Sequence, residues 1–325
     1  MKTQAIRIEK TGGPEVMRLV EIDLPDPGPD QVQVSLRAIG VNFIDTYQRS
    51  GLYPLALPSG LGNEAAGIVS KVGSAVRHLR EGDRVAYASG PPGTYAGAHN
   101  APANRVAGLP DAISFEAGAA MMLKGLSVRY LFKETYPLKS GETILFHAAA
   151  GGVGLIACQW SRHLGVTLIG TVGSEDKAKL AREHGCAHTI LYRIEDVPAK
   201  VREITGGRGV PVVYDSVGKA TFEASLDCLQ RRGLMVSFGN ASGPVTGVNL
   251  GLLMTKGSLY VTRPTAAHYM ITDEEFNTAV ADLFSVVASG AVKIPIHHKY
   301  PLTEAARCHE DLEGRRTTGA CILLP

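Results

Sequence analysis

A glycine-rich turn is the part of this sequence with the clearest chemical meaning. In the segment AAAGGVG, Ala149, Gly151 and Gly154 match the spacing G-x-G-x-x-G, with alanine in the first glycine position. The turn follows a strand-like apolar stretch and precedes a helix-like one, which is the context that a dinucleotide-binding turn requires. The backbone N–H groups of Gly152 and Val153 would then lie at a helix N-terminus, where a pyrophosphate is stabilised. A glycine-rich turn without a ligand is the simpler alternative.

The end of the following strand distinguishes NAD binding from NADP binding. NAD-dependent enzymes usually place Asp or Glu there to bind the ribose hydroxyls, whereas the stretch VTLIGTV is followed by Gly173 and Ser174. Ser174 can donate a hydrogen bond and Lys177 supplies a positive charge, and both suit a 2′-phosphate. Glu175 and Asp176 weaken this case, unless their role is to complement the N-terminal end of a helix dipole. We therefore expect NADPH as the cofactor.

Metal ligands are missing from the positions where a catalytic zinc would need them. Such a site needs Cys, His or carboxylate ligands that converge on one point. The stretch GNEAAG places Asn63 where a histidine ligand would be expected, and the stretch NFID contains no cysteine. We therefore expect no metal. The cysteines form no CxxC motif, and their odd number indicates free thiols in a reducing compartment; they are Cys158, Cys186, Cys228, Cys308 and Cys321.

The part of the chain before about residue 125 has the pattern of a small β domain. Gln31–Ala38 alternates polar and apolar residues as a half-buried strand does, and Gly67–Val72 and Asp83–Ala86 are short strands between glycine turns. This pattern predicts a small, irregular β-barrel. Phe115–Phe132 is largely apolar and predicts a helix.

From Glu142 onward, strand patterns and helix patterns alternate. Repeated β-α-β units with apolar strands predict a parallel sheet that helices cover on both faces. Tyr269–Val287 predicts a helix, Lys293–Lys299 a strand that returns to the first domain, and QRRG around Arg231 a solvated turn. The expected strands are Thr143–His147, Val166–Val172, Thr189–Tyr192, Val210–Asp215 and Leu234–Phe238, and the expected helices are Val153–Leu164, Glu175–His184, Glu195–Thr205 and Ala220–Leu229.

Composition excludes several classes of function. The chain has 325 residues, of which 45% are hydrophobic and 20% charged, which is typical of a packed globular protein with one or two domains. A net charge of +2 favours neither nucleic acid nor a membrane surface. The N-terminal stretch lacks the apolar core of a signal peptide, and no apolar run reaches about 18 residues. We expect a cytoplasmic protein without membrane or nucleic-acid partners.

Five stretches spread over nearly the whole chain carry a family resemblance: Gly40–Pro54, Phe146–Trp160, Val213–Gly218, Ser225–Asn240 and Lys256–Pro264. They resemble the quinone oxidoreductases, the zinc-free zeta-crystallin relatives among the medium-chain dehydrogenases/reductases. The resemblance implies an α/β fold, in which a Rossmann doubly wound parallel sheet (residues 126–265) is inserted in a GroES-like, mostly β catalytic domain (residues 1–125 and 266–325). It also implies NADPH-dependent reduction of a quinone or another electron-poor acceptor.

The same resemblance implies roles for individual residues. Asn42, Asp45 and Tyr47 would be catalytic, and Asn42, Tyr47, Tyr53 and Lys124 would bind the substrate. Asn42 and Tyr47 are hydrogen-bond donors suited to polarising an acceptor oxygen. Arg316, beside Arg315, departs from the family pattern. The implied cofactor-binding residues are Asn42, Asp45, Tyr47, Lys124, Tyr130, Gly152, Val153, Gly173, Ser174, Lys177, Tyr192, Ser216, Phe238, Gly239, Asn240, Ala241, Arg263 and Arg315.

Each candidate residue also has a structural interpretation. Asn42 and Asp45 could cap a short helix, and Lys177 could be a solvated helix charge. Tyr47 could be an ordinary amphipathic side chain between surface and core. His147 lies just before the glycine turn and is interpreted as a core or turn histidine rather than a base.

Two other functions remain open from the sequence. An alkenal or enoyl reductase would add hydride to an activated C=C bond with the same cofactor and the same kind of donor. Zeta-crystallin relatives also serve as lens structural proteins, and some bind AU-rich RNA. The sequence shows no basic stripe with interleaved aromatic residues that would favour RNA.

The stretch Ser258–Thr262 predicts a homodimer. It is a short apolar strand late in the Rossmann series, and a last strand lies at the edge of its sheet with unpaired N–H and C=O groups. The run contains no Lys or Pro, so a twofold axis could pair this edge with its copy. Alternatively, the helix expected at Tyr269–Val287 covers the edge.

Overall fold

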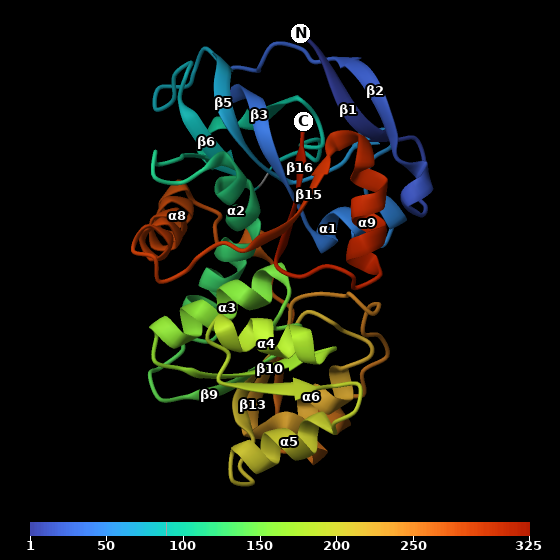
Figure 1. The fold of residues 1–325 in the computed structure, drawn as a ribbon, viewed down its shortest axis with the longest axis vertical. Coiled ribbons are helices and arrows are strands. Elements are labelled where there is room, and N and C mark those ends of the chain that lie inside the picture. The colour runs from blue at the N-terminus through green and yellow to red at the C-terminus, as the bar shows by residue number, and fades with distance from the viewer. Residues whose placement is uncertain (89) are drawn as a thin grey trace. The chain divides into compact units, whose positions relative to one another are not determined.

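The chain divides into two compact units in a computed structural model that describes every residue except Ser89. Unit 1 comprises Met1–Leu126, Thr272–Phe284 and Ile294–Pro325, and unit 2 comprises Ser127–Ile271 and Ser285–Lys293. Unit 1 therefore contains both ends of the chain, which Figure 1 marks N and C. Over the described residues, no helix is both long enough and apolar enough to cross a membrane.

A six-stranded parallel sheet forms the centre of unit 2. Its strand order is β11-β10-β9-β12-β13-β14, the doubly wound order 3-2-1-4-5-6 of the Rossmann fold. The helices α3 and α4 cover one face and α5 and α6 the other (Figure 1). This sheet confirms the expected β-α series. The elements are β9 Thr143–Phe146, α3 Gly152–His163, β10 Thr167–Val172, α4 Glu175–Glu183, β11 His188–Leu191, α5 Val197–Ile204, β12 Val210–Asp215, α6 Phe222–Cys228, β13 Leu229–Ser237, α7 Gly251–Thr255 and β14 Tyr260–Thr262.

The strands of unit 2 are apolar because both faces of the sheet are covered. Leu145, Ile169, Val213 and Met235 come from four different strands and are completely buried in one core cluster. Burying such side chains is the main favourable term that holds the helices to the sheet.

Unit 1 is mostly antiparallel β-structure around a second core. One sheet has the order β15-β16-β3-β5-β6-β8, with β7 also paired to β3, and a smaller sheet has the order β2-β1-β4. Completely buried side chains such as Ile8, Val34, Tyr87 and Tyr95 fill the core. The elements are β1 Lys2–Ile8, β2 Arg18–Asp23, β3 Gln31–Val41, α1 Phe43–Ser50, β4 Ser59–Gly60, β5 Glu64–Val72, β6 Arg84–Tyr87, β7 Ala98–Pro102, β8 Val106–Gly108, β15 Ile296–Pro301, α9 Ala305–Glu313 and β16 Ala320–Leu324.

Two longer helices have different bounds from those that the sequence predicts. Helix α2 (Phe115–Tyr130) ends in a π-helical turn at Leu131–Thr135. Helix α8 (Asp273–Ala288) begins four residues later than expected. Its start is fixed by a capping box, because the Glu275 N–H donates to Thr272 Oγ1 and the Thr272 N–H donates to the Glu275 carboxylate. The T-x-x-E spacing in the sequence is the signal for this start.

The prediction that the residues around Arg231 form a turn between two elements is wrong. The segment lies inside β13 as an exposed bulge, where the register with β12 shifts between Val210 and Val212. Arg232 adopts a left-handed φ of 59°, and its N–H donates to Gly257 O at 2.8 Å. The expected exposure is confirmed, since the bulge points into solvent.

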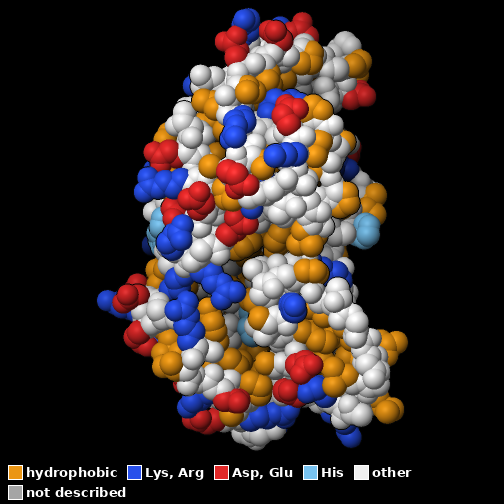
Figure 2. Space-filling model, turned by 90° about the vertical axis from the view of Figure 1, so that its right-hand side faces the viewer, with side chains coloured by type: hydrophobic (Ala, Val, Ile, Leu, Met, Phe, Trp, Pro, Cys, Tyr) orange, Lys and Arg blue, Asp and Glu red, His pale blue; other side chains and the backbone are white. Residues whose placement is uncertain are grey.

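Charges of both signs are interspersed with hydrophobic side chains over the face that Figure 2 draws. This mixture agrees with the small net charge of +2.

Candidate active site

The glycine-rich turn of unit 2 is built to receive an anion. It joins the end of β9 to α3, and Ala148 adopts a left-handed φ of 55° in it. A Cβ on Gly154 would lie 2.4 Å from Ala148 O, so only glycine fits there. The helix begins after Gly151, which has no side chain to cap it. The first N–H groups of α3, including those of Gly152 and Val153, are therefore suited to a phosphate oxygen.

A second group of expected residues gathers where β10 and β11 end. Ser174 is the N-cap of α4 and its Oγ accepts a hydrogen bond from the Lys177 N–H, so the hydroxyl proton is still available for donation. A Cβ on Gly173 would lie 2.9 Å from the Tyr192 hydroxyl. Glu175, which weakened the case for a phosphate, forms an ion pair with Arg182 at 2.8 Å. The structure thus brings Gly173, Ser174, Lys177 and Tyr192 together.

The loops that follow β12 and β13 form a third group in unit 2. The Ala241 N–H donates to Ser216 O, and a Cβ on Gly239 would lie 2.4 Å from the same oxygen. Arg263 donates to Gly239 O at 3.0 Å and to Ser237 O at 2.9 Å. The Arg263 guanidinium therefore holds the loop that contains Phe238, Gly239, Asn240 and Ala241.

Aromatic contacts place two further candidates of unit 2. Phe238 packs against Phe146, with ring centroids 5.7 Å apart. Tyr130 stacks on Tyr269 at a centroid distance of 4.7 Å. Tyr130, the last residue of α2, therefore also has a structural role through its contact with Tyr269.

In unit 1, the start of α1 is organised around Asp45, whose side chain is completely buried. Its carboxylate accepts hydrogen bonds from the Asn42 N–H at 2.8 Å, Asn63 Nδ2 at 2.7 Å and the Tyr95 hydroxyl at 3.0 Å. Burial raises the pKa of Asp45 to about 6, while these three donors act in the opposite direction. At neutral pH, Asp45 is therefore an ionised carboxylate that fixes the N-terminal turn of α1.

A buried polar chain that the sequence did not reveal extends from Asp45 to α9. The Tyr95 hydroxyl also contacts His309 Nε2 at 2.9 Å, and Arg49 donates to His309 Nδ1 at 3.2 Å. Arg49 further forms a bidentate ion pair with Glu313. Burial, and then the charge of Arg49, lower the pKa of His309 to about 3. His309 is therefore neutral, accepts from Arg49 and donates to Tyr95.

Glu64 is a second buried carboxylate beside Asn42, which the sequence did not reveal. Glu64 Oε2 accepts from Asn42 Nδ2 at 2.8 Å and pairs with Lys124 Nζ at 3.1 Å. Its other oxygen accepts the Leu123 N–H. The carboxylate thus connects the two expected substrate-binding residues Asn42 and Lys124. The available signal was its place in the stretch GNEAAG, directly after Asn63.

The two expected tyrosines contact each other. Tyr47 is buried and packs edge-on against Tyr53 at a centroid distance of 5.2 Å. The Tyr53 N–H donates to Tyr47 O. Arg315 lies in the exposed segment after α9 with a left-handed φ of 58°, and Arg316 forms an ion pair with Asp311 at 2.7 Å.

The position where zinc enzymes would carry a histidine is used for a hydrogen bond between side chains. Asn63 Nδ2 donates to both Asp45 Oδ1 and Gln48 Oε1. In the part of the chain that the structure describes, no three His, Cys, Asp or Glu side chains converge as metal ligands would. Zinc independence stays a prediction.

The fold and the phosphate-binding geometry define a dinucleotide-dependent dehydrogenase/reductase of the medium-chain type. Residues 28–120 match the alcohol dehydrogenase GroES-like domain, and residues 152–285 match the zinc-binding dehydrogenase domain. The expected combination of a GroES-like and a Rossmann-type domain is thereby confirmed. The chain belongs to the quinone oxidoreductase family, because its identity with curated members extends over its whole length.

Three relatives illustrate this similarity. The quinone oxidoreductase of Salmonella typhimurium is 59% identical over 99% of this chain and 100% of its own. The crystal structure of the Escherichia coli quinone oxidoreductase complexed with NADPH superimposes with a TM-score of 0.98 at 58% identity, covering 99% of this chain and 100% of that one. The 2-haloacrylate reductase of a Burkholderia species is 43% identical over 98% of both chains.

Replacing His309 by glutamine should make the protein less sensitive to acid. The pKa of His309 is about 3 in the folded protein and near 6.5 when unfolded, so the unfolded state binds the extra proton between these values. The wild type therefore loses about 1.4 kcal/mol of stability per pH unit from this group as the pH falls below 6.5. Glutamine can still accept from Arg49 and donate to Tyr95 without titrating.

Urea unfolding between pH 4.5 and 7.5 measures this effect as the difference in the free energy of unfolding between wild type and variant. The titration of Asp45 occurs in both proteins and therefore cancels in this difference. The exposed His163 provides the control, since His163→Gln should leave the pH dependence unchanged. Parallel stability curves for wild type and His309→Gln would contradict the neutral, buried state of His309.

Proposed function

We propose that this protein uses NADPH to reduce quinones. The observation that carries the proposal is the group formed by Gly173, Ser174, Lys177 and Tyr192 at the strand ends of a Rossmann sheet, in a chain of the quinone oxidoreductase family. This group offers a hydroxyl and an ammonium where NAD enzymes have a carboxylate, which suits the 2′-phosphate of NADPH. The relatives of known structure crystallised with NADPH support the same cofactor.

The residues of unit 2 fit this cofactor. The N–H groups of Gly152 and Val153 would hold the pyrophosphate. Gly154 has no side chain, so the helix can lie close to the backbone of Ala148. The loops at Ser216 and at Phe238–Ala241, with Arg263 behind them, would hold the nicotinamide half. When bound, NADPH supplies the hydride.

The residues of unit 1 would act on the acceptor. A quinone oxygen gains negative charge during reduction, and donors placed beforehand lower the barrier. The Tyr47 hydroxyl and the second amide proton of Asn42 are such donors, and Lys124 contributes positive charge while Glu64 orients it. Tyr53 would contact the ring of the substrate. Asp45 would contribute by orienting α1, and Arg315 would contact the cofactor.

Reduction of an activated C=C bond is the second candidate function. The specific observation that favours it is the 43% identity with a 2-haloacrylate reductase over nearly the whole chain. Hydride addition to an enone or acrylate also places negative charge on an oxygen, so the same donors would serve.

An assay with the two acceptor classes distinguishes these candidates. NADPH oxidation is followed with a simple benzoquinone and with an α,β-unsaturated ketone at matched concentrations. We expect kcat/KM for the quinone to exceed that for the enone by at least about tenfold, which corresponds to ~1.4 kcal/mol of transition-state stabilisation. A preference for the enone would replace the first proposal by the second, and failure of both acceptors would contradict both.

Replacing Lys177 by alanine should weaken NADPH binding selectively. A charged hydrogen bond contributes about 1.5–3 kcal/mol, reduced at a partly exposed site, so we expect KM for NADPH to rise about tenfold. KM for NADH should stay within about twofold, because NADH lacks the 2′-phosphate. Lys179→Ala on the exposed side of α4 is the matched control and should change neither value. Equal increases for both cofactors would remove Lys177 from the phosphate site.

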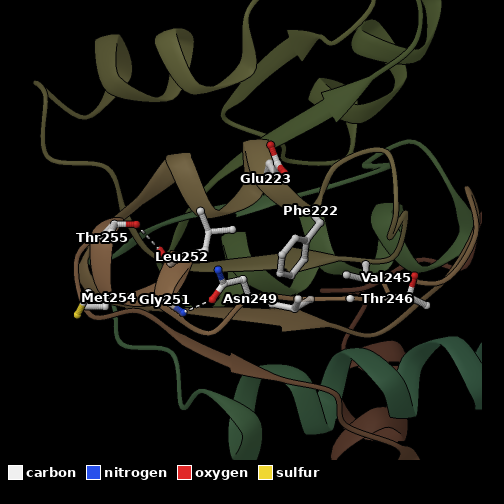
Figure 3. Close-up of a pocket in the computed structure, with 11 residues that line it drawn as sticks. Phe222, Glu223, Val245, Thr246, Asn249, Gly251, Leu252, Met254 and Thr255 are labelled. Carbon is white, nitrogen blue, oxygen red and sulfur yellow. Dashed lines mark hydrogen bonds between the residues drawn. The ribbon is translucent and has the colours of Figure 1, made fainter.

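We also propose that two copies associate through the edge of the unit 2 sheet. Strand β14 is the last strand of that sheet, and Tyr260 and Val261 are exposed rather than covered. Val248, Leu250 and Met254 are further exposed apolar side chains in the segment that precedes β14. Val248 and Met254 also line an open pocket of about 580 Å³, and Figure 3 shows the side chains of Phe222, Asn249 and Leu252 gathered there. Exposed apolar surface next to an unpaired strand edge favours a self-complementary contact.

A charge on the strand edge tests the dimer. Tyr260→Lys places two like charges near a twofold axis and should shift the protein from dimer to monomer in light scattering at micromolar concentration. The control is Ile194→Lys, which changes an exposed apolar residue outside this surface and should leave the mass unchanged. A wild type that is monomeric under these conditions would contradict the proposal.

We further propose that the protein acts in the cytoplasm. All five cysteines are free and buried, which supports a reducing compartment.

A further inference from the structure

A buried chain of polar side chains runs beneath the glycine-rich turn of unit 2. Thr171 Oγ1 contacts His147 Nδ1 at 2.9 Å, His147 Nε2 contacts Ser225 Oγ at 3.0 Å, and Ser225 Oγ donates to Asp215 Oδ2 at 2.7 Å. All four side chains are at most 2% exposed. The Ala148 N–H reaches Thr171 Oγ1 at 3.4 Å and closes the chain at the turn itself.

The direction of every proton in this chain follows from its two ends. Asp215 accepts from the Val217 and Gly218 N–H groups on one oxygen and from Thr221 and Ser225 hydroxyls on the other, so it acts as an ionised acceptor. Because Ser225 gives its only proton to Asp215, its oxygen must accept one from His147 Nε2.

The opposite nitrogen of His147 is then an acceptor. Thr171 donates its hydroxyl proton to Nδ1, and its oxygen remains free to accept the Ala148 N–H. Burial lowers the pKa of His147, so the ring is neutral and this tautomer is the stable one. The donors therefore run in one direction, from Ala148 through Thr171, His147 and Ser225 to Asp215, and each hydroxyl and ring N–H proton of the chain has an acceptor.

The chain joins two segments that the proposed function assigns to different parts of the cofactor, the turn to the pyrophosphate and the strand-end loop to the nicotinamide half. At one end, Thr171 holds the turn through its side chain and through its carbonyl, which accepts the Ala149 N–H at 3.1 Å. Ala148 needs this support because a left-handed φ of 55° is unfavourable for a residue with a Cβ. At the other end, Asp215 holds the loop from Ser216 to Gly218, against which Gly239 packs.

We propose that His147, Thr171 and Ser225 are positioning residues that set the affinity for NADPH by holding the pyrophosphate turn and the strand-end loop in register. The inference rests on the proposed use of NADPH and not on the identity of the acceptor. The three side chains do not touch the cofactor themselves. They act through the backbone of Ala148 and through the carboxylate of Asp215.

The proposal predicts an effect on affinity that is separable from stability. Ser225→Ala leaves His147 Nε2–H without an acceptor and Asp215 without one donor, so both segments lose a fixed partner. We expect the Kd for NADPH, measured by fluorescence titration, to rise about tenfold, with kcat at saturating NADPH within about twofold of wild type. Thr171→Val removes the link to Ala148 at nearly constant volume and should raise Kd to a similar extent.

Ser161→Ala is the matched control. Ser161 is also a completely buried serine of unit 2, and its hydroxyl donates to Cys158 O in its own helix. It should lower the melting temperature of the protein without changing the Kd for NADPH. A purely structural role would give all three variants the same pattern, with lower Tm and unchanged Kd.

Two substitutions at His147 complete the test. His147→Leu removes donor and acceptor together and should raise Kd about tenfold. His147→Gln keeps an amide donor for Ser225 and should recover at least half of that loss on a logarithmic scale. Wild-type Kd values in Ser225→Ala, Thr171→Val and His147→Leu would overturn the inference, whereas a wild type that does not bind NADPH would instead overturn the proposed function.

Discussion

Three carboxylates without any solvent exposure decide how the polar parts of this protein are arranged. Asp45 and Glu64 in unit 1 and Asp215 in unit 2 are each completely buried. A buried charge is strongly unfavourable unless donors surround it. Asp45 and Glu64 each have three donors and Asp215 has four, from backbone and side chains. Asp45 therefore fixes the start of α1, and Asp215 fixes the loop that follows β12. Glu64 connects Asn42 to α2, and several of the expected site residues lie in these segments.

This requirement explains why Asn42 has both a structural and a chemical interpretation. Its N–H donates to Asp45 at the start of α1, as the helix-cap interpretation requires, and its side-chain amide donates to Glu64. The residue that ends β3 thereby links two carboxylates, and its remaining amide proton has a fixed direction. Preorganised donors of this kind stabilise developing charge without reorganising, which is what reduction of a quinone oxygen requires.

The sequence predicted those features that depend on residues close together in the chain. Apolar strands with helical stretches between them gave the Rossmann series, and the spacing of Ala149, Gly151 and Gly154 located its turn, because period and turn chemistry are local. The polar chain from Asp45 to α9 could not be found in this way, since Tyr95 is 50 positions from Asp45 and His309 is 214 positions from Tyr95. Only the folded β-structure and α9 bring them together. The bulge in β13 was missed because Arg232 adopts a backbone conformation that its side chain does not predict.

Asn63 shows how one substitution changes the electrostatics of such a site. A histidine ligand presents a lone pair to a cation, whereas the Asn63 amide nitrogen presents its protons to Asp45 and Gln48. The charge of Asp45 is thus balanced by the neutral donors Asn63 and Tyr95 together with a backbone N–H. Several hydrogen bonds from neutral donors together offset the cost of burying the Asp45 charge. Because none of these donors carries a positive charge, they do not neutralise the carboxylate. The positive charge of Lys124 is instead paired with Glu64. Asp45 therefore fixes the start of α1, whereas Glu64 positions a cation.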